Sequence, residues 1–174
     1  MNLVRIYHKT DKEKLFNLYK NVAKDIGGVA RTFDEINKTY INTIIKYSSK
    51  SGIHLVVNHP TNENQLIGEI HCYKLQPNVF NHVLSELTVV VAKQFQGKGI
   101  GKQLFNTLLK KIETERKDIL RVELIVRESN IKAIDFYKQF GFKIEGKLEN
   151  RINSGNGTFE ADIPMAWINK YYNS

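Results

Sequence analysis

A short glycine-rich stretch between an apolar run and a helical pattern constrains the fold of this chain more than any other feature. The run "LTVVVA" (87–92) is predicted to be a buried strand, and "QFQGKGIGKQLF" (94–105) follows it with three glycines. Apolar residues then recur at helical spacing, which predicts a helix that begins near Gly99. A strand, a glycine turn and a helix in succession predict a crossover unit at the centre of an α/β domain.

The other segments extend this α/β pattern. Alternating or apolar β-rich runs predict strands at 3–7, 52–59, 64–75, 81–92, 119–126, 142–148 and 158–167. Helical spacing predicts helices at 12–26, 33–47 and 131–140 besides the one after the glycines. The length of 174 residues favours a single domain over 1–174. The order predicts a mixed α/β sheet with helices on both of its faces.

Composition limits the partners of the chain. The formal charge is +8, which favours anionic ligands, but basic and acidic residues are mixed along the chain. A nucleic-acid-binding protein is one alternative, although no recognition helix or basic-aromatic stripe is recognisable, so no nucleic acid partner is expected. Cys72 is the only cysteine, and no signal-like or membrane-spanning segment is evident. We expect a cytoplasmic protein without a membrane partner.

The glycines suggest a phosphate site. Backbone N–H groups in such a turn converge on an anion, and the dipole of the following helix adds attraction. Lys98 and Lys102 would add positive charge. A Walker A loop would require glycine at Gln96 and Ser or Thr at Gln103, and a dinucleotide fingerprint would require glycine at Lys102. ATP hydrolysis and NAD binding are therefore disfavoured. The structural alternative is a glycine turn that serves packing alone.

Two linked motifs resemble signatures of the GNAT superfamily of acyl-CoA-dependent N-acyltransferases. The first is Gln-x-x-Gly-x-Gly, formed by Gln96, Gly99 and Gly101 after the strand. The second is "NIKAIDFYKQFGF" (130–142), with Asn130, Ala133, Tyr137, Gly141 and Phe142 at the expected places. The likeness extends from about Leu84 to Ile144. It implies a GNAT-like fold with a central, mostly antiparallel sheet of about seven strands, and a homodimer is common on this fold.

The resemblance also implies a binding mode for acetyl-CoA. In the family, the pyrophosphate lies on the amides of the glycine loop, the pantetheine follows the preceding strand, and a tyrosine lies near the thioester sulfur. The implied pyrophosphate residues here are Gln96, Gly97, Lys98, Gly99, Ile100, Gly101 and Lys102. The implied pantetheine residues are Val89, Val90 and Val91, with Asn130 near the pantetheine arm and Tyr137 near the sulfur.

The chemistry of the side chains agrees with these roles. A phenol has an ordinary pKa of about 10, so Tyr137 could give a proton to a departing thiolate. The alternative is a purely structural role for Tyr137, as a half-buried aromatic residue on an amphipathic helix. An attacking amine must lose a proton, and Glu86 is the candidate base, with Glu123 or a water relay as alternatives. Some relatives carry a catalytic glutamate where Ile125 stands. Glu86, predicted to share a strand face with Leu84, could equally be a structural carboxylate.

These observations predict an N-acetyltransferase that moves an acetyl group from acetyl-CoA directly to a primary amine. The acceptor could be a small molecule or a protein N-terminus, which the sequence does not distinguish. The alternative is a non-catalytic acyl-CoA-binding or sensor domain on the same fold. The five histidines show no metal-ligand spacing, so no metal is expected and ordinary structural roles are predicted for them.

Overall fold

The structure is a computed structural model that describes residues 4–25, 29–155 and 157–173. The chain divides into two compact units, which are described separately below. The first unit contains Met1–Tyr73 and Thr88–Lys111, and the second contains Lys74–Leu87 and Ile112–Ser174. Strand β4 and helix α3 each contribute residues to both units. The single domain over 1–174 stays a prediction.

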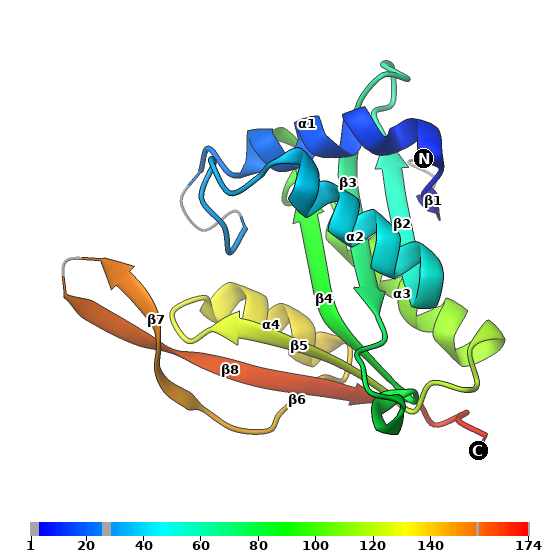
Figure 1. The fold of residues 1–174 in the computed structure, drawn as a ribbon, viewed down its shortest axis with the longest axis vertical. Coiled ribbons are helices and arrows are strands. Elements are labelled where there is room, and N and C mark those ends of the chain that lie inside the picture. Colours follow the sequence, from blue (N-terminus) through cyan, green and yellow to red (C-terminus); the bar gives the residue numbers. More distant parts are fainter. Residues whose placement is uncertain (1–3, 26–28, 156, 174) are drawn as a thin grey trace. The chain divides into compact units, whose positions relative to one another are not determined.

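The first unit is a sheet with three long helices (Figure 1). Its elements are β1 (Val4–Ile6), η1 (Lys9–Asp11), α1 (Lys12–Val22), α2 (Lys38–Ser51), β2 (Gly52–Asn58), β3 (Leu66–Tyr73), the end of β4 (Val83–Val91), η3 (Lys93–Phe95) and most of α3 (Ile100–Glu115). Strand β2 pairs antiparallel with both β1 and β3. The three strands predicted in this region, at 3–7, 52–59 and 64–75, are therefore confirmed.

The second unit is built on the long strand β8. Its elements are η2 (Asn78–Phe80), the start of β4, the end of α3, β5 (Arg121–Arg127), α4 (Ile131–Gln139), β6 (Lys143–Ile144), β7 (Leu148–Gly155) and β8 (Thr158–Ile168). Strand β4 pairs parallel with β5, whereas β5, β6 and β7 each pair antiparallel with β8. The expectation of a mixed α/β fold with mostly antiparallel pairing is confirmed.

The described residues form eight strands rather than about seven. The stretch 142–148, predicted as one strand, contains only the two-residue strand β6, and β7 begins at Leu148. Strand β7 has the sequence "LENRINSG", which is polar and carries no apolar alternation. Pairing with β8 holds it in a strand, and this pairing is not encoded locally.

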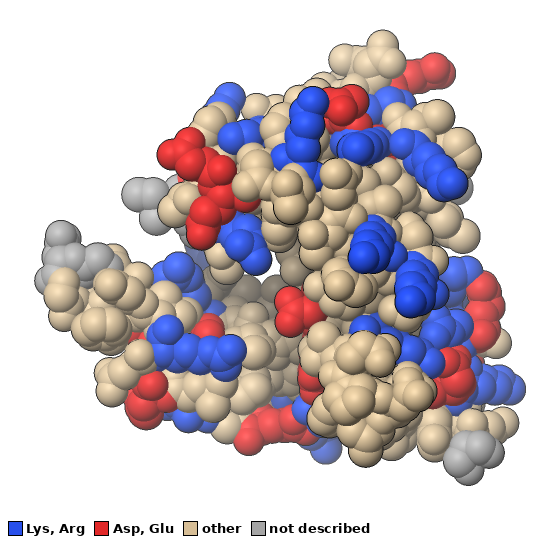
Figure 2. Space-filling model, viewed as in Figure 1, with Lys and Arg blue, Asp and Glu red and all other residues tan. Residues whose placement is uncertain are grey.

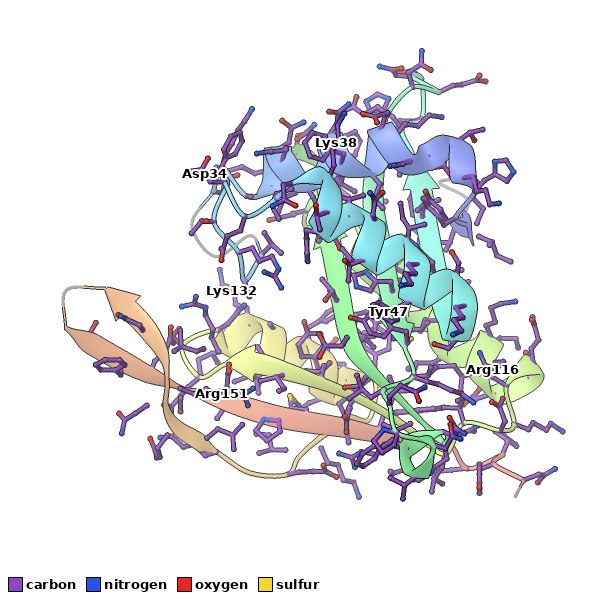
Figure 3. All side chains as sticks on the ribbon, in the orientation of Figure 1. Asp34, Lys38, Tyr47, Arg116, Lys132 and Arg151 are labelled. Carbon is purple, nitrogen blue, oxygen red and sulfur yellow. The ribbon has the colours of Figure 1, made fainter. Side chains whose placement is uncertain are left out.

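Two predicted helix boundaries are wrong. The second helix starts at Lys38 rather than near Phe33, because the side-chain oxygen of Asn37 accepts a hydrogen bond from the Tyr40 amide at 2.9 Å and caps it. Figure 3 shows Asp34 in the segment before α2 and Lys38 in its first turn. The first helix ends at Val22 instead of continuing to 26. Gly27 and Gly28, expected to terminate it, lie outside the described residues.

Helices cover both faces of the sheet in the first unit. Helices α1 and α2 lie across one face of β2 and β3 (Figure 1). On the other face, a Cβ atom added to Gly68 would lie only 2.8 Å from the Cγ2 atom of Ile100 in α3. Gly68 therefore lets α3 approach the sheet closely. The predicted two-sided arrangement is confirmed within this unit.

A carboxylate is buried beneath α1 and α2. Glu69 on β3 has no solvent exposure, and its Oε2 atom accepts a hydrogen bond from the Tyr19 hydroxyl at 2.8 Å. Its Oε1 atom lies 2.8 Å from Nδ1 of His71 and 2.9 Å from Nε2 of His54. The contact with His54 is a close polar contact rather than a hydrogen bond. His54 and His71 thus have structural roles, as predicted.

The environment of Glu69 keeps it ionised. Burial alone would raise the pKa of its carboxyl group, but the neighbouring His71 and His54 side chains outweigh burial and lower the pKa to about 2 from the ordinary 4.5. A carboxyl group whose pKa is lower in the folded state stabilises the fold above its unfolded pKa. This stabilisation is complete above about pH 4.5 and is lost as the pH falls toward about 2.

Substitution of Glu69 by glutamine is expected to lower the free energy of unfolding by about 3 kcal/mol at pH 7, because it leaves the buried imidazoles without a carboxylate partner. Urea denaturation at pH 7 measures this loss. Repeating the denaturation from pH 5 to pH 2 should show a shallower loss of stability in the variant than in the wild type, since the variant lacks this titrating group.

The matched control is Glu63→Gln in the exposed turn between β2 and β3, where only the backbone carbonyl of Glu63 accepts a hydrogen bond, from Lys14. This control should change the unfolding free energy by less than about 0.5 kcal/mol. Equal stability of Glu69→Gln and the control at pH 7 would show that the buried carboxylate does not stabilise the fold.

Candidate active site

The glycine turn between β4 and α3 uses a backbone conformation that favours glycine. Gly97 has a φ angle of +72° and Gly99 one of +80°. A Cβ atom built at either position meets no described atom within 4 Å, so the space beside both glycines is open. The positive φ angles, rather than crowding, therefore account for glycine at these two positions. Helix α3 begins at Ile100, which confirms the predicted start near Gly99.

Gln96 holds the turn in place. Its side-chain Nε2 atom donates a hydrogen bond to the carbonyl oxygen of Val91 at 3.0 Å, and its backbone N–H donates to the carbonyl oxygen of Lys93 at 3.2 Å. Both bonds tie the turn to the end of β4 and to η3. Gln96 thus stabilises the loop. The backbone amides that follow it lead into the N-terminus of α3.

The start of α3 is electropositive. The first four N–H groups of a helix have no acceptor within the helix, and the helix dipole places partial positive charge there. The first turn of α3, which is fully described, contains no acidic residue and contains Lys102. Lys98 is exposed, with its Nζ atom 5.2 Å from the centre of the Phe95 ring. This arrangement can bind an anion such as a phosphate.

Basic and acidic side chains are interspersed on the face of the molecule shown in Figure 2. Lys93, which precedes the turn, forms an ion pair of 2.8 Å with Asp25. Of the three lysines that bunch around the glycines in the sequence, Lys93 therefore has an acidic partner within the same unit. The face shown in Figure 2 thus carries charges of both signs, in agreement with the mixed sequence pattern.

Strand β4 changes character at Glu86. Its parallel ladder with β5 comprises the pairs Val83–Arg121 and Leu84–Val122. Two residues further on, Glu86 has a φ angle of +54°, which is unusual for a residue with a side chain. Such a conformation costs roughly 1–3 kcal/mol and is often found at functional sites. Glu86 therefore lies at an irregularity of β4.

This irregularity corrects the predicted strand face of Glu86. Leu84 and Ser85 are both buried while Glu86 is exposed, so the alternation expected along β4 fails there. The alternative base, Glu123 on β5, accepts a hydrogen bond of 2.8 Å from Nε of Arg121. Arg121 also forms an ion pair with Glu145. Glu123 is thus part of an ionic network, and Glu86 is exposed.

Helix α4 carries the second motif. Its N-terminus is capped by Asn130, whose side-chain oxygen accepts a hydrogen bond from the Ala133 amide at 3.2 Å. Beyond its C-terminus, Gly141 has a φ angle of +87°, and a Cβ atom there would lie 3.6 Å from the Trp167 ring. Phe142 then enters the core with 2% exposure. The predicted cap and glycine terminator of this helix are both confirmed.

Tyr137 lies on α4 in an aromatic environment. Its ring is 5.8 Å from that of Phe136 and 6.1 Å from that of Phe142, measured between ring centres. The residue is half-buried, and burial raises the pKa of its phenol to about 12. Tyr137 therefore carries its proton at neutral pH and can donate a hydrogen bond.

The candidate residues fall into two groups. Val89, Val90 and Val91 and the loop Gln96–Lys102 belong to the first unit, while Glu86, Asn130 and Tyr137 belong to the second. Their assembly into one active site stays a prediction. Within the described residues, no cluster of three or more His, Cys, Asp or Glu side chains is arranged to hold a metal ion. No helix in the same part of the chain is long and apolar enough to span a bilayer.

Solved structures share this fold. An acetyltransferase of the GNAT family from Streptococcus pneumoniae has a TM-score of 0.81 and 21% identity over 97% of this chain and 99% of its own. A phosphinothricin acetyltransferase from Sinorhizobium meliloti, solved in complex with AcCoA, has a TM-score of 0.81 and 13% identity over 99% of this chain and 90% of its own. At these identities the likeness establishes the fold alone.

Sequence comparisons identify the family. A probable spermine N(1)-acetyltransferase of Bacillus subtilis subsp. natto is 37% identical over 59 residues, which are 34% of this chain and 38% of the relative. A spermine/spermidine N(1)-acetyltransferase of Bacillus subtilis strain 168 is 36% identical over the same shares. The chain thus spans well under half the length of these curated relatives. Residues 24–142 match the family model described as the acetyltransferase (GNAT) family, and the chain therefore belongs to this family of acyltransferases.

Proposed function

We propose that this protein transfers an acetyl group from acetyl-CoA directly to a primary amine. The observation that carries the proposal is the glycine turn at the N-terminus of α3, where Gly97 and Gly99 have positive φ angles beside open space. Such a turn suits a diphosphate. Membership of the GNAT family supports acyl transfer as the reaction. The AcCoA in the structure of the phosphinothricin acetyltransferase with the same fold supports the choice of cosubstrate.

In the proposed complex, the pyrophosphate of acetyl-CoA accepts hydrogen bonds from the amides that follow Gln96, up to Lys102. The pantetheine arm follows Val89–Val91 like an added strand. The short ladder between β4 and β5, which ends at Leu84, supports this placement because a strand edge offers backbone partners to an extended ligand. Asn130, whose side-chain oxygen caps α4, would contact the arm through its amide nitrogen.

The reaction proposed here needs no covalent enzyme intermediate. The amine nitrogen attacks the thioester carbonyl carbon, a C–N bond forms, and the C–S bond then breaks. Because the Tyr137 phenol has a pKa of about 12 and a free thiol one of about 8.5, full proton transfer to the departing thiolate is unfavourable. Tyr137 therefore stabilises the leaving sulfur by donating a hydrogen bond, and the thiolate takes its proton from solvent.

The amine must lose one proton before attack and a second as the amide forms. We assign proton removal to Glu86, directly or through water, because it is exposed at the irregular point of β4. Glu123, whose carboxylate accepts a hydrogen bond of 2.8 Å from Arg121, is the alternative. A base of this kind typically contributes a factor of about 100 or more to the rate.

Glu86→Gln is expected to lower kcat about 100-fold, because the variant removes the proton acceptor while preserving size. The matched variant Glu123→Gln, on the neighbouring strand, should lower kcat less than about 10-fold. Steady-state kinetics with both variants and the wild type measure the difference. A larger loss in Glu123→Gln than in Glu86→Gln would reverse the assignment, and small losses in both would favour a water relay.

Polyamines are the first acceptors to test, because the curated relatives are named as spermine or spermidine acetyltransferases. An amino acid, an antibiotic and a peptide with a free N-terminus complete the panel. Release of free CoA thiol is measured with each amine and without any amine. Amine-dependent thiol release, with the acetylated product identified by mass spectrometry, supports the enzyme.

The second candidate is a non-catalytic acyl-CoA-binding domain. Calorimetric binding of acetyl-CoA without thiol release in the presence of any amine would favour it over the enzyme. Absence of acetyl-CoA binding to folded protein would overturn both. A homodimer also stays a prediction, which sedimentation analysis of the same preparation tests.

A further inference from the structure

A cavity of about 420 Å³ in the first unit lies outside the residues assigned to acetyl-CoA. Three segments line it: one side of α1, the turn between β2 and β3, and the residues just after β4. The lining residues are Lys14, Asn17, Leu18, Asn21, Val22, Asn62, Asn64, Gln65, Leu66, Ala92, Lys93 and Gln94. This volume lies within the usual range for small-molecule sites, roughly 300–1,000 Å³.

The cavity has an apolar part and a polar part. Four of its residues, Leu18, Val22, Leu66 and Ala92, also belong to the buried core of the unit, with exposures of 1–6%. The polar part consists of six carboxamide side chains and two lysines. All twelve lining residues are described, and none of them carries a carboxylate. An apolar floor with polar groups around it is the usual lining of a small-molecule site.

The polar part offers both hydrogen-bond donors and acceptors. The side-chain oxygen of Asn21 already accepts a bond of 3.1 Å from Lys24, and that of Asn62 accepts one of 3.0 Å from the Asn64 amide. Each of these oxygens has a second lone pair, so both side chains can still accept as well as donate. The two ammonium groups are donors only, and they favour a ligand that also carries anionic oxygens.

The two lysines are able to bind such a ligand although each already has a partner. Lys14 donates to the carbonyl oxygen of Glu63 at 2.6 Å and lies 3.7 Å from Oδ1 of Asp11, and Lys93 pairs with Asp25 at 2.8 Å. An ammonium group has three N–H donors, so at least one N–H of each lysine can still bind a ligand. The side chain of Lys93 is 74% exposed, and an ion pair so exposed is weak and readily exchanged.

We propose that this cavity is a second ligand site, which binds a nucleoside monophosphate. The base packs on the apolar residues, with its edge bonded to the carboxamides. Asparagine and glutamine side chains form paired hydrogen bonds with adenine in this way. The phosphate lies between Lys14 and Lys93. Because Lys93 and Gln94 belong to the segment that leads into the glycine turn, occupancy here would alter acetyl-CoA binding, and the coupling would be reciprocal.

Calorimetric titration with AMP tests the site, and the Gly99→Glu variant separates it from the acetyl-CoA site. We expect AMP to bind wild type and Gly99→Glu with equal affinity. The double substitution Lys93→Ala/Asn17→Ala should weaken AMP binding roughly tenfold or more, because it removes a charged and a neutral hydrogen-bond partner. Its matched control is Lys50→Ala/Asn42→Ala, two exposed positions on α2, which should bind AMP as the wild type does.

Three results would overturn the proposal. AMP binding that is lost in Gly99→Glu but retained in Lys93→Ala/Asn17→Ala would assign the nucleotide to the acetyl-CoA site. Binding of inorganic phosphate as tight as that of AMP would show a simple anion site in which the nucleoside contributes nothing. No detectable AMP binding by folded wild-type protein would exclude the nucleotide altogether. None of these results depends on acetyl transfer, so the proposed catalytic function is tested independently.

Discussion

Substitution of Gly99 by glutamate is expected to weaken acetyl-CoA binding at least about 100-fold, or by about 3 kcal/mol. A Cβ atom at this position meets no described atom within 4 Å, so the new side chain would start in open space beside the turn. There its carboxylate would face the diphosphate and repel it. Calorimetric titration of acetyl-CoA into wild type and variant measures the loss.

Backbone strain alone must be separated from this effect. Gly99 has a φ angle of +80°, and a residue with a side chain pays roughly 1–2 kcal/mol to adopt such a conformation. Gly157, in the turn between β7 and β8, has a φ angle of +74° and the same open surroundings. Gly157→Glu therefore introduces the same charge with comparable strain. We expect it to lower stability similarly and to leave acetyl-CoA binding intact.

The comparison has a decisive outcome in either direction. Loss of binding in Gly99→Glu but not in Gly157→Glu locates the diphosphate at the start of α3. Equal binding by both variants and the wild type would remove the glycine turn from the cosubstrate site. It would leave the family membership of the chain untouched, because that rests on the match over residues 24–142.

Tyr137→Phe is expected to lower kcat about 100-fold with little change in KM for acetyl-CoA. The phenol would donate its hydrogen bond to sulfur only as negative charge develops there, so its loss affects the transition state more than the bound ground state. The phenylalanine ring retains the contacts with Phe136 and Phe142, so any change in the free energy of unfolding reports the hydroxyl group alone. Steady-state kinetics and urea denaturation measure the two effects.

Tyr171→Phe is the control for this substitution, since Tyr171 is 58% exposed beyond the end of β8. It should leave both kcat and stability at wild-type values. If Tyr137→Phe also retains kcat within about twofold, the phenol has no part in the transition state and leaving-group stabilisation must come from elsewhere.

Several features could be predicted from the sequence because they depend on neighbouring residues. The turn after β4, the start of α3, the Asn130 cap and the Gly141 terminator each follow from residues within about one helical turn of the feature. Both family motifs lie in these same stretches. This is why the fold class and the family follow from the sequence, whereas the boundary of α2 depended on one unrecognised cap, Asn37.

Other features depend on residues that meet only in the folded chain. The strand β7 has no apolar alternation of its own and exists through its pairing with β8. The buried carboxylate of Glu69 accepts a hydrogen bond from Tyr19, 50 residues earlier in the chain. The positive φ angle of Glu86 interrupts a run that reads as a regular strand. None of these contacts produces a local pattern that a sequence could display.

The sequence by itself determined the class of fold, the glycine turn and the membership of an acyltransferase family, because strand, turn and helix signals act over a few residues. The tertiary structure alone decided which polar side chains share a buried or enclosed space. The Glu69 cluster joins one helix and two strands, and the cavity joins α1, the turn between β2 and β3, and the residues just after β4. Burial and long-range register set these assemblies, and neither is a property of a short segment.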